Sequence, residues 1–225
     1  IERIINEVPT LYRLRLSSIE LMEINDELLD VLEHNQNKIA NHLHIPLQSG
    51  SDGVLKRMER KYIMKEYFEK IDIIKKRFPD IAITTDCLAG FVGETDNDFE
   101  DALEFIEKIN FSSMHIFPYS RRKNTEADKM DGHLPGELIH ARAKKMQKLA
   151  QKMAKNYQDE HIGKEMVVLV EQKKNNYWIG HTSNYLEVKF VSKEELTNKL
   201  VLVKLNKVDN NTIIAEFIKE VENEF

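Results

Sequence analysis

A chain of 225 residues with 41% hydrophobic and 32% charged residues has the composition of a folded globular protein rather than a disordered one. The formal net charge of −5 excludes a uniformly basic nucleic-acid binder, although basic residues can still gather locally. No apolar run approaches the roughly 20 residues that cross a bilayer, and no signal peptide opens the chain. We therefore expect a cytoplasmic protein without a membrane segment.

Cysteine usage excludes several further kinds of site. Cys87 is the only cysteine, so the chain cannot form an intrachain disulfide. By itself Cys87 cannot hold an iron–sulfur cluster or a thiolate zinc site, and we assign no metal ligands. The chain begins at Ile1 in what reads as the end of a helix, so we expect it to be part of a longer protein.

Alternating strands and helices fill the first 120 residues. Apolar and basic residues alternate over 11–18, and further strands are predicted over 42–48, 81–91 and 112–119. Helices with apolar residues at spacings of three and four separate these strands. Four strands alternating with helices indicate parallel pairing and right-handed crossovers, as in the second half of a (β/α) barrel or an open α/β sheet.

The strand over 42–48 has two distinct faces. Leu43, Ile45 and Leu47 share one face by the two-residue period, and polar residues including His44 and Gln48 share the other. A polar, glycine-bearing turn and a capped helix follow at once. Folds of the α/β class place ligands at such strand ends, so this turn is the first candidate site.

The pattern changes in the last third of the chain. One long helix is predicted from Pro135 to about His161, and five short strands with turn residues between them follow it, over 165–172, 177–182, 185–191, 199–206 and 211–217. About sixty residues in five strands suggest a small closed barrel of the OB type. We therefore predict an α/β part over 1–134, a connecting helix over 135–161 and a β-barrel over 162–225.

Three long runs resemble a known family. They are HLHIPLQSGSDGVLKRMERKY, AITTDCLAGFVGET and HIFPYSRRKNTEADKMDGHLP, and they resemble the methylthiotransferases of the radical S-adenosylmethionine superfamily. Within the family, the chain is most similar to the branch that modifies N6-threonylcarbamoyladenosine next to the tRNA anticodon. The runs that carry this similarity are RLRLSSIE, HIPLQSGSD and FPYSRRK. The last part resembles a TRAM domain, the RNA-binding module of that family. The resemblance implies the C-terminal part of a radical SAM partial TIM barrel followed by TRAM.

The resemblance also implies cofactors. Members of this family use S-adenosylmethionine and two [4Fe-4S] clusters, and they place a methylthio group on C2 of an adenine in the tRNA anticodon stem-loop. Both cysteine-bearing regions of the family are missing here, so this chain would begin just before the third strand of the radical domain. We expect this chain alone to be inactive, and we expect its missing strands to leave an open edge that favours dimerisation.

By motif position, the cofactor-binding candidates lie at two strand ends, on the strand over 81–91 and in the glycine turn at its end. They are Ser18, Gln48, Ser49, Thr85, Asp86, Gly90 and Gly93. Amide, hydroxyl and carboxylate groups there can hold the ribose and amino-acid parts of S-adenosylmethionine, and the glycine turn can approach adenine. The alternatives are structural hydrogen bonds and an ordinary strand-to-helix turn. We assign no catalytic residue, because the chemistry belongs to the cofactors.

The RNA-binding candidates are a basic loop after the fourth strand and a set of aromatic and polar residues in the barrel, namely Arg121, Arg122, Lys123, Tyr177, Trp178, Asn184, Tyr185 and Lys189. Basic residues contact phosphates, and aromatic rings stack on unpaired bases. The alternative for the aromatic residues is a place in the barrel core.

Three hypotheses for the function are compatible with the sequence. The first is a methylthiotransferase for threonylcarbamoyladenosine in tRNA. The second keeps the superfamily and changes the substrate to isopentenyladenosine in tRNA or to an aspartate of a ribosomal protein. The third is an RNA-binding module without catalysis, whose α/β part serves as a scaffold.

Overall fold

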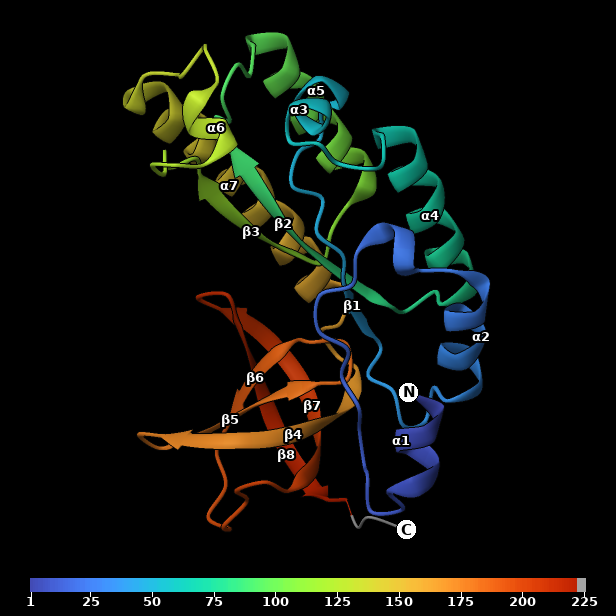
Figure 1. The fold of residues 1–225 in the computed structure, drawn as a ribbon. Coiled ribbons are helices and arrows are strands. Elements are labelled where there is room, and N and C mark those ends of the chain that lie inside the picture. The colour runs from blue at the N-terminus through green and yellow to red at the C-terminus, as the bar shows by residue number, and fades with distance from the viewer. Residues whose placement is uncertain (222–225) are drawn as a thin grey trace.

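The computed structural model describes residues 1–221 and contains a sheet with helices and a separate small barrel (Figure 1). The long helix α7 (Gly136–Asp159) precedes the barrel and also packs along the sheet. No helix within the described residues is long and apolar enough to cross a membrane.

The sheet is parallel, and its strands lie in the order β1 (His42–His44), β2 (Ala82–Ala89) and β3 (Ser113–Pro118). The helices between the strands are α3 (Asp52–Arg57), α4 (Met64–Arg77) and α5 (Asp96–Ile109). Parallel neighbours need such crossover connections, because the chain must return to the same end of the sheet. The predicted alternation of strands and helices is confirmed for these three strands.

Residues 11–18 do not form the regular strand that their alternation predicts. They make two isolated parallel bridges, from Leu14 to Ile39 and from Ser18 to His44. Between these bridges the Nη2 of Arg15 donates to a carbonyl of the barrel at 3.1 Å. The helical turns around this segment are α1 (Glu2–Glu7), the 3-10 turn η1 (Leu21–Glu23) and α2 (Asp26–His34). Because β1 has only three residues, it offers residues 11–18 too short a partner for a continuous ladder.

β1 is shorter than the strand predicted over 42–48, but its two faces are as expected. Pro46 has no N–H for a ladder, and pairing resumes only at Gln48, which bridges Cys87. Leu43, Ile45 and Leu47 are each at most 1% exposed, as predicted for the face that packs on helices. The alternation therefore continues through the irregular end of the strand.

Capping residues set where three helices begin. The side chains of Asn25 and Ser51 each accept a hydrogen bond from the amide three residues further on. Thr95 and Asp98 form a reciprocal capping box at the start of α5. Each cap satisfies amides that the first helical turn leaves without partners, so the cap fixes the point at which the chain turns into a helix.

α7 completes a layer of helices on one side of the sheet (Figure 1). Its buried face has the expected spacings of three and four, with Ile139, Ala143, Met146, Ala150 and Met153. Within the described residues, no helix covers the opposite face of the sheet, which we call the open face. Phe117 of β3 is 50% exposed there.

The barrel contains the five predicted strands, β4 (Glu165–Lys174), β5 (Tyr177–Thr182), β6 (Glu187–Phe190), β7 (Leu200–Asp209) and β8 (Thr212–Glu220). They close in the order β4-β5-β6-β8-β7, and only the β6–β8 pair is parallel among the paired strands of the described barrel. Trp178, Phe190 and Val201 are completely buried in its core. Closure leaves the barrel without the open edge that an isolated sheet would present.

Gly180 of β5 lies where two barrel strands approach closely. A Cβ at this position would come within 2.0 Å of the carbonyl oxygen of Leu169. We expect Gly180→Ala to lower the free energy of unfolding by about 2 kcal/mol or more, because the backbone must shift. Gly136→Ala is the control, since its Cβ would meet no atom within 4 Å. Urea unfolding of the two variants is monitored by the fluorescence of Trp178, the single tryptophan. Equal unfolding midpoints for Gly180→Ala and Gly136→Ala would contradict the close approach of Gly180 to Leu169.

Candidate functional site

The carboxyl ends of β2 and β3 border a pocket of about 640 Å³. Its apolar lining includes Leu88, Phe91 and Phe117, and its rim carries three arginines, Arg57, Arg60 and Arg122. Parallel α/β sheets bind ligands at this end of their strands. An apolar pocket of this size with a few charged groups at its rim suits a nucleotide-sized ligand.

The open face beside this pocket carries three interacting polar side chains. The Nδ1 of His44 lies 2.9 Å from the Oγ1 of Thr84, and its Nε2 lies 3.4 Å from a carboxylate oxygen of Asp86. The side chain of Asp86 is 32% exposed. This carboxylate is therefore accessible and can accept hydrogen bonds from hydroxyl or ammonium groups.

Two other predicted cofactor residues lie close to Asp86. Gln48 has a left-handed φ of 62°, and its backbone amide donates to the backbone carbonyl of Asp86 at 2.9 Å. Its side chain lines the pocket. Ser18 is exposed and pairs with His44. The structure thus brings Ser18, Gln48 and Asp86 together from three segments of the sequence.

Ser49 and Thr85 lie in the packed interior instead. The Oγ1 of Thr85 donates to the carbonyl of Ile45 at 2.7 Å and accepts from the amide of Leu47 at 2.8 Å. Ser49 is 1% exposed, and its hydroxyl accepts from the amide of Ser51 at 3.3 Å. Both hydroxyls satisfy backbone groups between the strands and the helices, so the structure does not bring them to the open face.

The glycine turn after β2 is fixed to α7 by a buried ion pair. Gly90 and Gly93 have φ values of 78° and 72°, which glycine adopts without strain. The carboxylate of Glu94 accepts from the amide of Gly90 at 3.0 Å and from Arg142 at 2.8 Å. Burial raises the pKa of Glu94, and Arg142 opposes this rise. Local sequence patterns do not reveal this pair, because Arg142 follows 48 positions later on a helix whose other basic residues face solvent.

A second polar cluster connects the starts of α3 and α5. Asp98 accepts from the hydroxyl of Ser51 at 2.5 Å, from Arg57 at 3.1 Å and from the amide of Thr95 at 2.9 Å. Burial by itself raises the pKa of Asp98, but these hydrogen bonds together hold that pKa at about 2. The cluster positions Arg57 at the rim of the pocket.

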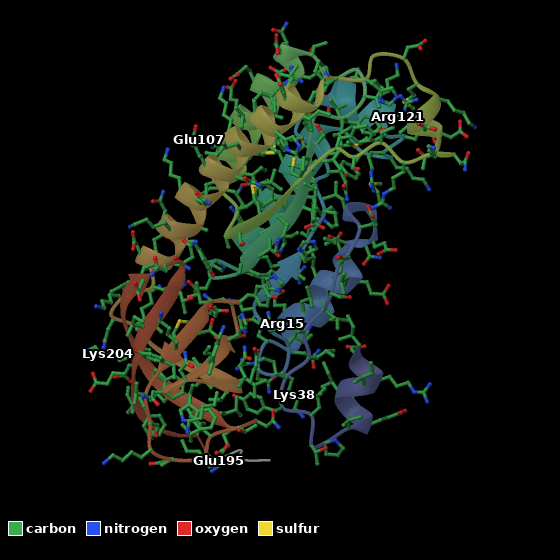
Figure 2. The ribbon with its side chains drawn as sticks, turned by 90° about the vertical axis from the view of Figure 1, so that its left-hand side faces the viewer. Arg15, Lys38, Glu107, Arg121, Glu195 and Lys204 are labelled. Atoms are coloured by element: carbon green, nitrogen blue, oxygen red, sulfur yellow. The ribbon has the colours of Figure 1, made fainter. Side chains whose placement is uncertain are left out.

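The three residues of the basic loop have different surroundings. Arg121, which is labelled in Figure 2, lies in this loop. It donates to both the side chain and the carbonyl of Asp128, at 2.5 and 3.0 Å. Arg122 lines the pocket, and its guanidinium has no hydrogen-bond partner within residues 1–221. Lys123 is exposed. Arg122 is therefore better placed than Arg121 to contact an external phosphate.

The predicted RNA-binding residues of the barrel divide into surface and interior positions. Tyr177 is 40% exposed, and the Nζ of Lys189 lies 5.8 Å from the centre of its ring. The same Nζ donates to a carboxylate oxygen of Asp209 at 3.2 Å. Trp178 is completely buried, so the structure gives its ring no face for stacking on a base. Asn184 is also buried, and its side chain donates to the hydroxyl of Tyr157 at 2.8 Å.

Tyr185 lies where the barrel meets the sheet. Its ring stacks on His42 of β1 at 4.5 Å and on His181 of β5 at 4.9 Å, measured between ring centres. The guanidinium of Arg15 lies 4.7 Å from the same ring. Tyr185 is 46% exposed, so one part of the ring contacts the sheet while another part remains accessible.

The residues present do not fit an iron–sulfur cluster. Cys87 points into the packed interior, where its thiol lies 3.5 Å from the carbonyl of Gln48, and burial raises its pKa to about 12. A cluster ligand must be a thiolate, which this environment disfavours. Across residues 1–221, no group of three or more His, Cys, Asp or Glu side chains is placed to hold a metal ion.

Comparison with known proteins defines the class. Residues 2–106 match the Radical SAM superfamily. Coproporphyrinogen III oxidase (HemN) from Escherichia coli, a radical SAM enzyme, superposes with a TM-score of 0.52 at 12% identity, over 87% of this chain and 46% of that one. The parallel β/α sheet is therefore of the radical SAM type.

Curated relatives narrow the class further. The chain is 37% identical over 217 residues to the threonylcarbamoyladenosine tRNA methylthiotransferase MtaB of Bacillus subtilis, covering 94% of this chain and 48% of that protein. It is 33% identical over 216 residues to the tRNA-2-methylthio-N(6)-dimethylallyladenosine synthase of Caldicellulosiruptor saccharolyticus, covering 95% and 46%. The chain is thus related to the radical SAM methylthiotransferases, and it spans about half the length of these relatives.

The Asp98 cluster predicts a loss of stability in acid. Because the pKa of Asp98 is about 2 in the folded protein and near its ordinary value of 3.8 in the unfolded chain, the carboxylate stabilises the fold above pH 4. This contribution, about 2 kcal/mol, disappears as the pH falls from 4 to 2. Urea unfolding of the wild type and of Asp98→Asn at pH 5 and pH 2 measures it. If the free energies of unfolding of the wild type and Asp98→Asn differed by the same amount at both pH values, the low pKa of Asp98 would be contradicted.

Proposed function

We propose that the protein containing this chain is a tRNA methylthiotransferase that uses S-adenosylmethionine. In this proposal the chain supplies part of the cofactor site and an RNA-binding barrel. The observation that carries it is the pocket at the ends of β2 and β3, beside the accessible carboxylate of Asp86, in a chain related to methylthiotransferases.

The residues around the pocket fit S-adenosylmethionine. The carboxylate of Asp86 and the side-chain amide of Gln48 offer hydrogen bonds to ribose hydroxyls and to an amino-acid group. Leu88 and Phe91 offer an apolar wall for an adenine ring. S-adenosylmethionine supplies the radical chemistry when bound, while the residues of this chain bind it, orient it and exclude water.

The cluster ligands must come from elsewhere in the protein. Cys87 is the single cysteine, and its buried thiol is not available as a ligand. We infer that this chain by itself has no methylthiotransferase activity. The remaining strands, which carry the cluster, would then extend the sheet at its edge, so that the open face lines the inside of the completed barrel.

The RNA substrate would contact both parts of the chain. Arg122 at the rim of the pocket can neutralise a phosphate. Tyr177 and Lys189 on the barrel offer a partly exposed ring and a nearby ammonium group, a combination that suits an unpaired nucleotide. The anticodon stem-loop of a tRNA supplies both kinds of group, because its loop bases are not all paired.

The proposal also concerns which nucleoside in the tRNA is modified. Identity to the threonylcarbamoyladenosine relative is 37%, and identity to the dimethylallyladenosine relative is 33% over nearly the same length. We propose threonylcarbamoyladenosine as the substrate, and dimethylallyladenosine is the second candidate.

Nucleoside analysis tests the proposed activity. The complete protein, with its clusters reconstituted anaerobically, is incubated with tRNA and S-adenosylmethionine, and the digested tRNA is analysed by mass spectrometry. We expect the 2-methylthio form of threonylcarbamoyladenosine. The methylthio form of dimethylallyladenosine would support the second candidate. Cleavage of S-adenosylmethionine without any modified nucleoside would overturn the tRNA proposal.

Substitution of Arg122 tests the RNA contact. We expect Arg122→Ala to weaken binding of an anticodon stem-loop about tenfold and to reduce its salt dependence by about one ion, because one phosphate contact is lost. Arg3→Ala is the matched control, since it removes the same charge from an 85% exposed side chain on α1, at the far end of the molecule (Figure 1). Fluorescence anisotropy at two salt concentrations measures both. Equal weakening by the two substitutions would argue against a specific contact.

A further inference from the structure

A continuous path of contacts leads from the barrel across the open face to Asp86. Tyr185 stacks on His42, and the Nε2 of His42 lies 2.8 Å from the Oγ1 of Thr84. The same hydroxyl lies 2.9 Å from the Nδ1 of His44. The Nε2 of His44 lies 3.4 Å from the carboxylate of Asp86. The side chains of His42, Thr84 and His44 therefore lie between Tyr185 of the barrel and Asp86, the candidate cofactor residue.

The hydroxyl proton of Thr84 gives this path a direction. Thr84 contacts two imidazole nitrogens, and its hydroxyl has one proton to donate and two lone pairs that can accept. The Nδ1 of His42 is buried and has no hydrogen-bond partner in the described part of the chain. A buried N–H without a partner is rarer and more costly than a buried acceptor without one. The proton of neutral His42 therefore belongs on Nε2, which donates to Thr84.

His44 lies between Thr84 and Asp86. The carboxylate of Asp86 can only accept, so neutral His44 carries its proton on the Nε2 that lies 3.4 Å from it. The Nδ1 of His44 is then an acceptor, and it receives the hydroxyl proton of Thr84. Each donor thus points from the barrel interface toward Asp86.

The surroundings of His42 keep it neutral. Burial lowers the pKa of His42 to about 3, with further lowering by Arg15, His44 and His181. Glu171 faces this group from β4, but it lies against His181, at 3.0 Å, rather than against His42. The ring of Tyr185 covers His42 from the barrel side. At neutral pH, His42 therefore has one proton to donate.

We propose that His42, Thr84 and His44 form a one-way hydrogen-bond relay that presents the Nε2–H of His44 to the carboxylate of Asp86, and that docking of the barrel through Tyr185 keeps this relay in place. The three residues are positioning residues, since they act on the cofactor through Asp86. The functional meaning of the relay rests on the proposed function, whereas its direction is a property of this chain. The relay also gives Tyr185 a role beyond contact with RNA.

Histidine tautomers report the direction of the relay. Long-range ¹H–¹⁵N spectra of the full chain, labelled with ¹⁵N-histidine and assigned by single His→Gln variants, distinguish Nε2–H from Nδ1–H. We expect both His42 and His44 as Nε2–H tautomers. Thr84→Val removes the donor to His44 and should turn its single tautomer into a mixture, and Thr84→Ser should restore the wild-type pattern. An Nδ1–H tautomer for His44 in the wild type, or no change in Thr84→Val, would overturn the relay.

Paired substitutions of Tyr185 test the dependence on barrel docking. Tyr185→Ala uncovers His42, so we expect its signals to titrate at about pH 6, near the ordinary range of histidine. Tyr185→Phe keeps the stacked ring, and we expect His42 to remain neutral down to pH 5 in this variant and in the wild type. A His42 that remains neutral at pH 5 in Tyr185→Ala would refute the link to the barrel. These spectra need neither cofactor nor tRNA, so their outcome is independent of the nucleoside assay.

Discussion

The alternation of side chains along β2 is the constraint on which the rest of the structure depends. β2 is the central strand and pairs with a parallel neighbour on each side, so its orientation is fixed. Thr85 and Cys87 consequently enter the packed layer beneath the helices, while Thr84 and Asp86 reach the open face. A slip of one residue would exchange these two sets. The same strand therefore provides both core residues and candidate cofactor residues.

Two hydrogen-bonded polar clusters hold the loops around the pocket. Glu94 and Arg142 connect the glycine turn to α7, and Asp98 connects the start of α3 to the start of α5. Both carboxylates are hydrogen-bonded several times, which offsets the cost of removing a charge from water. The loops at the strand ends are thus fixed by side chains that contribute no atoms to the open face.

The barrel does more than carry the residues that we propose to contact RNA. Its Tyr185 contacts β1 through His42, and Arg15 of the first part donates to a carbonyl in the barrel. These contacts set the orientation of Tyr177 and Lys189 relative to the pocket. A ligand that contacts both parts would therefore meet a surface that is already organised, which lowers the entropic cost of binding.

The sequence by itself determined the alternation of strands and helices, the caps at Asn25, Ser51 and Thr95, and the five strands of the barrel, because these depend on local periodicity and turn chemistry. It also indicated that Gln48 lies at a strand end and that Asp86 lies on the next strand. Only the tertiary structure decided that Trp178 belongs to the core, that Arg121 is paired with Asp128, and that residues 11–18 form bridges instead of a strand. Pairs such as Glu94–Arg142 and Tyr185–His42 join residues far apart in the chain, and no local pattern encodes which distant partner a side chain will meet.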